Sequence, residues 1–367
     1  MDILEQERVA LIALQQAEQV GSKTALILLE NFGNARAVFQ ASKSDLLTAL
    51  YDQLNAQNKK IADYLPQARQ RLWDQAAEVL VQTRAIGGYV IQWMDPDYPS
   101  LLRHIPYPPL TLFIKGNLDF SEVYSYIGIV GTRQNSQYGY DTTRKIVQEL
   151  RGAPNCIVSG LAEGIDAIAH QAALDNEMPT IGVLGHGIER IFPPKNKALA
   201  EKMLENGAIV SEFLPYSAGR RENFAIRNRL VAGLCSTLVV VESAARGGSL
   251  ITAQFAQEFN REVLAVPGRV GDVLSAGCNA LIAENKAALW QPNSWEKEGA
   301  ATIHPPLQAD NPLHQQLLNV LQKNQCTIDL LYIHLPDWGE AQIAAVLLEL
   351  EFAGRVKKLP GNQYGII

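Results

Sequence analysis

The chain has 367 residues, 47% of them hydrophobic and 19% charged, a composition typical of a globular protein with two or three domains. Its formal net charge of −6 argues against a protein that coats nucleic acid indiscriminately, so a DNA-binding surface would have to gather its positive charge locally. Four scattered cysteines without a CxxC pair, an acidic N-terminus and the lack of a long apolar run argue against a disulfide framework, a metal site, a signal peptide and a membrane span. We therefore expect a cytoplasmic protein.

Residues 1–80 are predicted to form short helices, because apolar residues recur at helical spacing in VALIALQQA, TALILLENF and DLLTALYDQL. The stretch VGSKTALILLENFGNARAVFQAS has the order helix, glycine turn, helix. It resembles helix-hairpin-helix or SAM-like modules, which can contact a DNA backbone or a protein, and a helical domain that only packs is an equal alternative. Residues 81–121, rich in proline and aromatic residues, are predicted to be a connector with one or two strands.

Residues 122–292 repeat one pattern, in which an apolar β-rich run is followed by a Gly/Ser turn and a helix. The runs are YSYIGIV, NCIVSG, TIGVLG, AIVSEF, TLVVVES and EVLAVPG. Continuous apolar runs suit a parallel sheet that helices cover on both faces. The pattern therefore predicts an α/β fold with a doubly wound, Rossmann-like parallel sheet.

The C-terminal part begins with a polar, proline-containing stretch, residues 293–312, which is predicted to be a linker. In residues 313–367, helical periods end in two β-like strands around Pro360, Gly361 and Asn362. This order predicts a winged-helix-like domain.

Small and polar residues follow several of the predicted strands. In an open parallel sheet, ligands bind outside the carboxyl ends of the strands, and glycines and helix N-termini let an anion approach closely. The candidate positions are Gly131, Thr132, Arg133, Ser136, Tyr138, Gly139, Ser159, Gly160, Gly247, Gly248 and Ser249. For the glycines alone, tight turns between strands and helices are the alternative explanation.

Basic residues in or beside the same loops favour a positive groove: Arg133, Lys195, Lys197, Arg220, Arg221, Arg227, Arg229 and Arg246. Phe192, just before the Pro-Pro-Lys-Asn stretch, could stack on a base, a contact worth ~1–3 kcal/mol, or it could belong to the core. A dinucleotide or ATP site is not predicted, because no GxGxxG follows the first strand and no GxxxxGK[ST] is present.

Several long motifs occur in a specific order: VGTRQNSQYG, IVSGLAEGIDAIAHQAAL, TIGVLGHGIERIFPPKN, IVSEF, NFAIRNRLVAGL, VVVESAARGGSLITAQFAQEFNREVLAVPG and GCNALI. Together they resemble the DprA/Smf (DNA-processing protein A) family over essentially the whole α/β part. The resemblance implies a dimer that binds incoming single-stranded DNA during natural transformation, protects it and loads RecA onto it, without a cofactor. By motif it implies DNA contacts at Arg133, Ser159, Gly160, Lys195, Asn196, Arg227, Arg229, Gly247, Gly248 and Ser249.

Two stretches depart from the family pattern. Ala225 and Ile226 stand where a proline usually precedes the RNR motif, and residues 281–286 (LIAENK) replace the usual LI-x-x-GA ending. We expect the first departure to leave the groove intact. The second leaves the interpretation of Asn279 and the following turn open.

An enzyme is the main alternative. The α/β part also resembles Rossmann-like phosphoribohydrolases that hydrolyse nucleotides, but residues 245–253 lack the glutamate of their PGGxGTxxE signature. Asp166 and His170, spaced i,i+4, could form an acid/base pair or only support a helix.

A sequence-specific regulator built on the winged helix is a third possibility. Residues 310–367 carry more acidic than basic side chains, and the helical stretch AQIAAVLLELE is not basic, whereas a helix that reads DNA should be. We therefore expect this part of the chain to contact protein.

Overall fold

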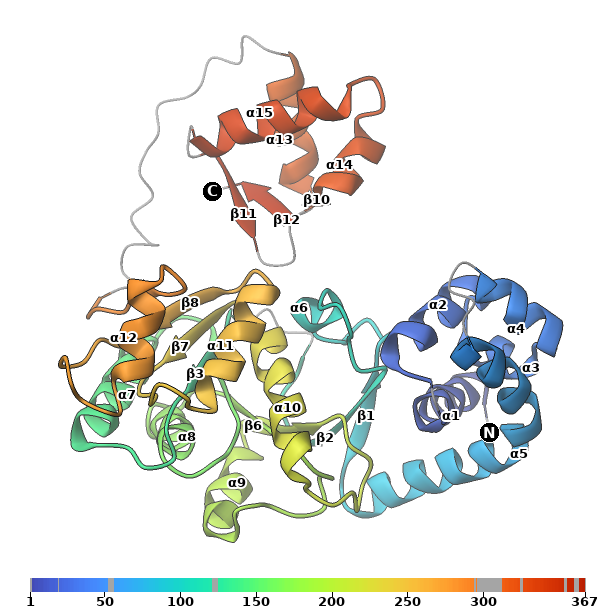
Figure 1. Ribbon diagram of the computed structural model, residues 1–367, viewed down its shortest axis with the longest axis horizontal. Coiled ribbons are helices and arrows are strands. Elements are labelled where there is room, and N and C mark those ends of the chain that lie inside the picture. The colour runs from blue at the N-terminus through green and yellow to red at the C-terminus, as the bar shows by residue number, and fades with distance from the viewer. Residues whose placement is uncertain are drawn as a thin grey trace.

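The computed structural model describes residues 2–18, 20–51, 56–120, 125–293, 295, 312–323, 326–352, 355–359 and 363–366. Within these residues, nine strands form one large sheet between two layers of helices, and three short strands form a second sheet near the C-terminus (Figure 1). The predicted fold class is confirmed: a Rossmann-like α/β sheet is flanked by an N-terminal helical part and a C-terminal winged helix. None of the described helices is both long and apolar enough to cross a membrane.

The N-terminal part is helical, as its apolar periodicity predicts. Its helices are α1 (Ile3–Gln16), α2 (Ser22–Phe32), α3 (Ala35–Gln40), α4 (Lys43–Ala49) and α5 (Ala56–Ala85). The predicted glycine turn lies between α2 and α3, where Gly33 has a φ of 77° and donates its N–H to the Leu29 carbonyl oxygen at 2.8 Å. This left-handed conformation costs a glycine little.

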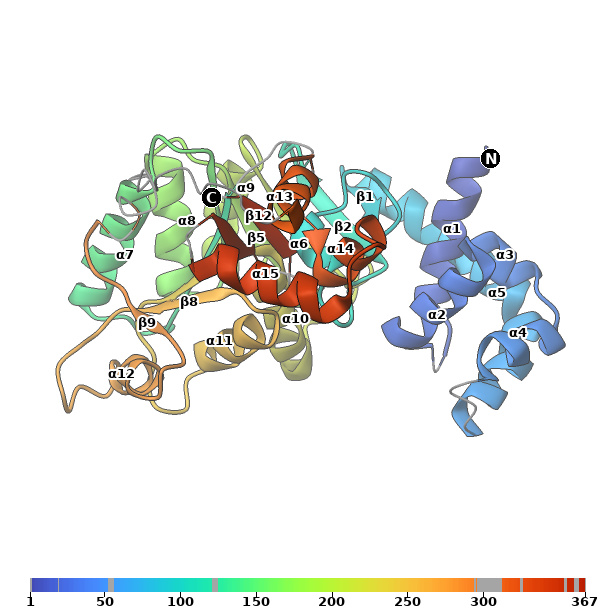
Figure 2. The same cartoon turned by 90° about the horizontal axis from the view of Figure 1, so that it is seen from above.

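These helices share one hydrophobic core with the end of the large sheet. Leu11 and Leu65 of the helices belong to the same buried cluster as Phe113 and Ile209 of the sheet. Figures 1 and 2 show the helices gathered beside strand β1 (Tyr89–Gln92). The N-terminal helices are therefore packed onto the sheet.

The large sheet has the strand order β1-β2-β6-β5-β4-β3-β7-β8-β9. The remaining strands are β2 (Thr111–Gly116), β3 (Ser125–Val130), β4 (Asn155–Ser159), β5 (Thr180–Val183), β6 (Gly207–Ser211), β7 (Thr237–Val240), β8 (Glu262–Ala265) and β9 (Ala288–Leu289). All neighbours from β6 to β9 are parallel. The two strands from the predicted connector extend the sheet with antiparallel pairs, because β2 pairs antiparallel with β6 and β1 pairs antiparallel with β2.

The helices of this part are α6 (Ser100–Arg103), α7 (Gln137–Glu149), α8 (Ile165–Asp175), the 3-10 helix η2 (Pro194–Asn196), α9 (Lys197–Met203), α10 (Arg221–Leu234), α11 (Ser249–Glu258) and α12 (Ala276–Ala283). Helices α7, α8 and α9 lie on one side of the sheet, and α10, α11 and α12 lie on the other (Figure 2). The strands alternate accordingly, since Ile157 packs in the α7 and α8 cluster while Cys156 and Val158 pack in the α10 and α11 cluster. The sheet is thus buried on both faces.

The strand order reverses beside β3. From β3 the chain runs outward through β4, β5 and β6, and it then returns to place β7 on the other side of β3. A reversal of this kind opens a crevice at the carboxyl ends of the strands, where doubly wound sheets bind ligands.

The C-terminal part has its own core, built around Leu317, Leu331 and Leu347. Its elements are α13 (Pro312–Lys323), β10 (Cys326–Thr327), α14 (Ile328–His334), α15 (Glu340–Phe352), β11 (Val356–Leu359) and β12 (Gln363–Ile366). The strands pair in the order β10-β12-β11, and β11 and β12 form the expected hairpin. Residues 360–362, predicted as its turn, and most of the predicted linker lie outside the described residues.

Candidate nucleic-acid interface

Four loops meet at the carboxyl ends of the central strands, and together they are called the carboxyl edge here. They are the β3 loop (residues 131–136), the β4 loop (160–164), the β5 loop (184–193) and the β7 loop (241–248). Because β4, β3 and β7 are neighbours, their loops lie against one another.

The β3 loop carries Arg133, and Glu242 of the β7 loop holds its two ends. The main-chain oxygen of Glu242 accepts the Thr132 N–H at 2.8 Å, and its carboxylate accepts the N–H of Ser136 at 3.0 Å and the hydroxyl of Ser136 at 2.5 Å. The Ser136 hydroxyl oxygen also accepts the Gly139 N–H at 3.1 Å and so caps α7. Arg133 is exposed between these fixed points, so its guanidinium faces solvent from an ordered backbone.

The β4 loop is fixed by buried polar side chains. Ser159 donates its hydroxyl to the Ile129 carbonyl oxygen at 2.6 Å. The carboxylate of Asp166 accepts the Ala162 N–H at 3.3 Å, and Asn196, which is 5% exposed, donates its side-chain N–H to the Ala162 oxygen at 3.1 Å. Ser159 and Asn196 thus support the edge from beneath.

Arg227 of α10 lies below the β4 loop and is only 5% exposed. It donates to the Val183 carbonyl oxygen at 2.6 Å, and a Cβ atom at Gly160 would collide with its guanidinium. Burial lowers the pKa of Arg227, Asp166 opposes this shift, and Arg133 adds to it. Burial likewise raises the pKa of Asp166, against the influence of Arg227.

Arg133 and Arg227 lie close enough for their positive charges to interact, and Asp166 is the carboxylate that offsets the charge of the buried Arg227. The two positive charges repel each other where water screens them poorly. An anion bound at Arg133 would relieve that repulsion. This geometry suits a phosphate.

The β5 loop presents an aromatic ring and a lysine. The Phe192 side chain is 54% exposed, and its ring lies 6.1 Å from that of Phe224, measured between ring centroids. Lys195 is exposed, with its Nζ atom 3.9 Å from a carboxylate oxygen of Glu163. Such a loose exposed ion pair contributes little, so Lys195 remains available to a ligand.

The β7 loop leads into α11 through Gly247 and Gly248. The Gly247 N–H donates to the Ala244 carbonyl oxygen at 2.9 Å, and the hydroxyl of Ser249 donates to that of Ser243 at 2.9 Å. Gly248 is exposed at the start of α11, the positive end of the helix dipole.

The predicted site residues thus differ in what they can touch. Those exposed to solvent are Arg133, Tyr138, Phe192, Lys195 and Gly248; those half-buried are Gly131, Thr132, Ser136 and Gly247. Those buried in support of the loops are Gly139, Ser159, Gly160, Asn196, Arg227 and Ser249.

Arg229 is engaged elsewhere. Its guanidinium donates to the Tyr107 carbonyl oxygen at 2.6 Å and forms an ion pair with Glu212. The side chain therefore ties α10 to the connector and to the end of β6. Arg229 supports the packing of α10, and we assign it no direct contact with a ligand.

Two residues of the carboxyl edge were not singled out as site residues from the sequence. Glu242 directly follows the VVV run, and a carboxylate just after a buried parallel strand signals a polar role at the strand end. Phe224 backs the exposed ring of Phe192, and its only signal was its place in the NFAIRNR motif.

His170 does not pair with Asp166 as the acid/base alternative requires. It is fully buried, and its Nδ1 atom lies 2.7 Å from the Thr180 hydroxyl oxygen. Burial lowers the pKa of His170 to about 3. Among the described residues, no group of three or more His, Cys, Asp or Glu side chains is placed to hold a metal ion.

We expect the protein to lose stability as the pH falls below 6.5, because His170 stays neutral in the folded state while an unfolded histidine is protonated near that pH. One such group lowers the free energy of unfolding by about 1.4 kcal/mol per pH unit in this window, which extends down to the folded pKa. Urea unfolding at pH 7 and pH 5 measures the effect. A His170→Gln variant should show a smaller loss, and an equal loss in both proteins would contradict the assignment.

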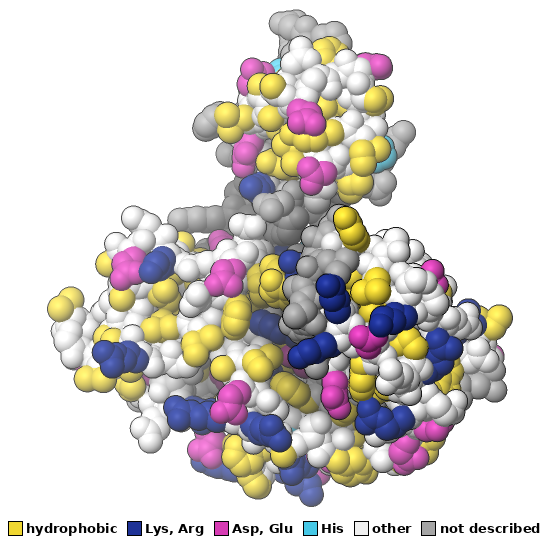
Figure 3. Space-filling model, turned by 45° about the vertical axis from the view of Figure 1, so that its right-hand side comes forward, with side chains coloured by type: hydrophobic (Ala, Val, Ile, Leu, Met, Phe, Trp, Pro, Cys, Tyr) yellow, Lys and Arg dark blue, Asp and Glu magenta, His cyan; other side chains and the backbone are white. Residues whose placement is uncertain are grey.

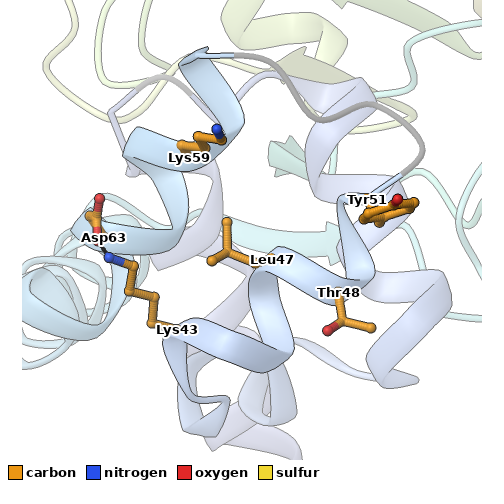
Figure 4. Close-up of a pocket in the computed structure, with 6 residues that line it drawn as sticks. All are labelled: Lys43, Leu47, Thr48, Tyr51, Lys59 and Asp63. Carbon is orange, nitrogen blue, oxygen red and sulfur yellow. Dashed lines mark ion pairs between the residues drawn. The ribbon is translucent and has the colours of Figure 1, made fainter.

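Two cavities are bordered by described residues. One, of about 300 Å³, lies between α4 and α5, where Lys43 and Asp63 form an ion pair and Tyr51 stands on the opposite side (Figure 4). The other, of about 880 Å³, lies at the carboxyl edge, between residues 136–138, Glu242 and the β8 loop (residues 266–275). Only the second adjoins the loops described above.

On the face that Figure 3 shows, Lys and Arg side chains are interspersed with Asp and Glu over the sheet-containing and helical parts. The winged helix, at the top of that view, shows mainly acidic, apolar and neutral side chains. On this face, positive and negative side chains are therefore mixed.

Two family models match the chain. The model described as DNA recombination-mediator protein A matches residues 89–296, and the model of the DprA winged helix domain matches residues 301–362. The first spans more than half of the chain and contains the whole carboxyl edge.

Relatives and solved structures agree with these matches. Protein Smf of Synechocystis is 34% identical over 311 residues, which cover 74% of this chain and 78% of that protein. The crystal structure of DNA processing protein A from Streptococcus pneumoniae aligns with a TM-score of 0.63 and 32% identity, covering 76% of this chain and 92% of that one. The structure of DNA processing protein A from Helicobacter pylori, described as showing a single-stranded DNA binding mode, aligns with a TM-score of 0.53 and 25% identity, covering 57% and 94%.

With the family model matching more than half of its length, and a relative 34% identical over most of both chains, the chain belongs to the DNA recombination-mediator protein A family.

Proposed function

We propose that this protein binds single-stranded DNA at the carboxyl edge of its large sheet. The observation that carries the proposal is that the exposed cations Arg133 and Lys195 lie at one edge of the sheet together with the exposed ring of Phe192. The single-stranded DNA binding mode described for the Helicobacter pylori relative supports the same choice of ligand.

Each accessible element of the edge has a role in this proposal. Arg133 and Lys195 bind phosphates, and the positive end of the α11 dipole, beside Gly248, attracts a further one. The exposed ring of Phe192, backed by Phe224, stacks on a base. The buried residues Ser159 and Asn196 hold the loops in position.

A single strand fits this surface better than a duplex. The face of a base is free to stack on an exposed ring only where the base is not already stacked in a duplex. The basic groups are few and lie at one edge, so they match a short stretch of backbone. The bases contact the protein through their faces, and little sequence preference is expected.

Titration of labelled oligonucleotides tests this function. We expect tighter binding to a single strand than to a duplex of the same length. Affinity should fall as salt rises, with a log–log slope of about −0.7 for each phosphate neutralised. Fluorescence anisotropy at several salt concentrations measures both properties, and equal or tighter binding to the duplex would contradict the proposal.

Replacing Phe192 by alanine should weaken binding of the single strand by about five- to 150-fold, because one stacked base contributes ~1–3 kcal/mol. The salt slope should stay the same, since no charge is removed. A Tyr51→Ala variant is the control, because Tyr51 is also an exposed aromatic residue, at 73%, but lies in the N-terminal helices. Equal losses in the two variants would argue against stacking at the β5 loop.

We further propose that the protein acts in the cytoplasm as a homodimer, protects the bound strand and loads RecA onto it during natural transformation. In this proposal it works by binding and not by catalysis. The winged helix contacts protein, because its exposed side chains include the apolar Ile333 and Leu348 and acidic residues such as Glu349 and Glu351. Strand exchange assays with RecA test the loading of RecA, and sedimentation of the purified chain tests whether it is a dimer.

A further inference from the structure

The 880 Å³ cavity at the carboxyl edge is not used by the proposed DNA groove. It lies on the other side of the β3 loop from the β4 loop, with Glu242 and the β8 loop as its other walls. It therefore opens where the strand order reverses between β3 and β7, the position at which doubly wound sheets bind ligands.

The helix start that borders this cavity is already occupied by a carboxylate of the protein. At such a crevice the start of the following helix usually receives a phosphate through its free N–H groups. Here the N–H and the hydroxyl of Ser136, at the start of α7, both donate to the carboxylate of Glu242. The same carboxylate lies where a Cβ atom of Gly139 would stand. A carboxylate of the protein thus takes the place of the ligand phosphate at the start of α7, and a second anion would be repelled from that position.

The other walls suit a flat, mostly apolar group that donates hydrogen bonds. The ring of Tyr138 is held in place because its hydroxyl donates to the Pro267 carbonyl oxygen at 2.9 Å. Val273, which is 74% exposed, and Leu274 line the cavity, and the charged Asp272 and Arg269 of the same loop stand beside them. Apolar walls with a few polar groups are typical of small-molecule sites, and carboxylates accept hydrogen bonds from hydroxyl and amino groups.

We propose that this cavity binds one nucleoside unit, a base with its sugar, of the bound strand. The proposal rests on the proposed function, because the β3 loop joins the two sites: Arg133 binds the phosphate in the groove, and three residues later Ser136 borders the cavity. A nucleoside offers a flat ring for Tyr138 and hydroxyl or amino donors for Asp272. Its phosphates stay outside, away from Glu242.

The direct test uses a free nucleoside, so that it does not depend on strand binding. The full-length protein is titrated with deoxyadenosine by saturation-transfer NMR. A Val273→Trp variant fills the cavity, and a Val270→Trp variant is the matched control, because Val270 lies on the same loop but is 100% exposed and does not line the cavity. We expect deoxyadenosine to bind the wild type and the Val270→Trp variant, and to bind the Val273→Trp variant at least about tenfold more weakly.

Two results of the deoxyadenosine titration would overturn the inference: equal deoxyadenosine affinity in the two tryptophan variants, or displacement of deoxyadenosine by inorganic phosphate. A second experiment tests whether the bound nucleoside unit belongs to a DNA strand. Each variant is titrated with an ordinary oligonucleotide and with an oligonucleotide that lacks its bases. The Val273→Trp substitution should weaken binding of the ordinary oligonucleotide and leave binding of the one without bases unchanged. If neither variant changes binding of the ordinary strand, the cavity does not serve the strand. That result would leave the proposed function unaffected, because the proposed function is contradicted only if the wild-type protein fails to bind single-stranded DNA.

Discussion

Reversing the charges of Arg133 and Lys195 to glutamate is expected to weaken the binding of single-stranded DNA by about 100-fold or more. Each charge-assisted hydrogen bond to a phosphate contributes about 1.5–3 kcal/mol, and each new carboxylate repels the strand. Lys195→Glu also places a second carboxylate near Glu163. Two lost phosphate contacts should make the log–log salt slope less steep by about 1.4. Fluorescence anisotropy with a labelled oligonucleotide measures both quantities.

The control for this prediction is a second double reversal with the same change in net charge, Lys145→Glu with Arg151→Glu. Both residues are exposed. Lys145 lies in the later part of α7 and Arg151 follows that helix, so both are remote from the helix start at the carboxyl edge. The control should lose only a few-fold in affinity. A loss as large as that of the first variant would mean that net charge, and not the carboxyl edge, governs binding.

Replacing Arg227 by methionine should lower the free energy of unfolding by about 3–5 kcal/mol, because it removes the buried positive charge that offsets a buried carboxylate and leaves that charge uncompensated. The partner is Asp166, whose pKa burial already raises. Methionine retains much of the volume, so the loss reports mainly on the charge. Urea unfolding of the wild type and the variant measures it.

A double variant, Arg227→Met with Asp166→Asn, separates stability from binding. Removing both charges should recover a part of the lost stability. Single-strand affinity should stay low in both variants, since the positive potential behind Arg133 is gone. If the double variant is no more stable than Arg227→Met alone, the two side chains do not form the pair described here.

The sequence predicted the α/β fold because its apolar runs are long and each is followed by turn residues. It also predicted which loops meet, since the ends of parallel strands share one edge. The sequence could not show that the two arginines of the RNR motif have different roles. Arg227 and Arg229 are two positions apart on α10, hence about 200° apart around the helix, and only packing decides that one lies beneath the β4 loop while the other binds Glu212.

The role of Glu242 could not be predicted from the sequence either. Its partner Ser136 lies in a loop 106 positions away in the chain, and no local pattern joins the two. Phe192 was left open between stacking and the core, and its exposed fraction of 54% now favours stacking. Both outcomes depend on tertiary packing, which the spacing of residues does not determine.

The position of β1 and β2 has a consequence for any attempt to isolate the DNA-binding part. A fragment that began at residue 122, where the first parallel strand is preceded by the predicted connector, would lack both antiparallel strands and leave β6 as a bare edge. Unprotected edge strands pair with other chains and aggregate, and Ile209 of β6 would also lose the cover of Phe113 and its cluster. The smallest fragment that keeps a protected sheet therefore begins before Tyr89.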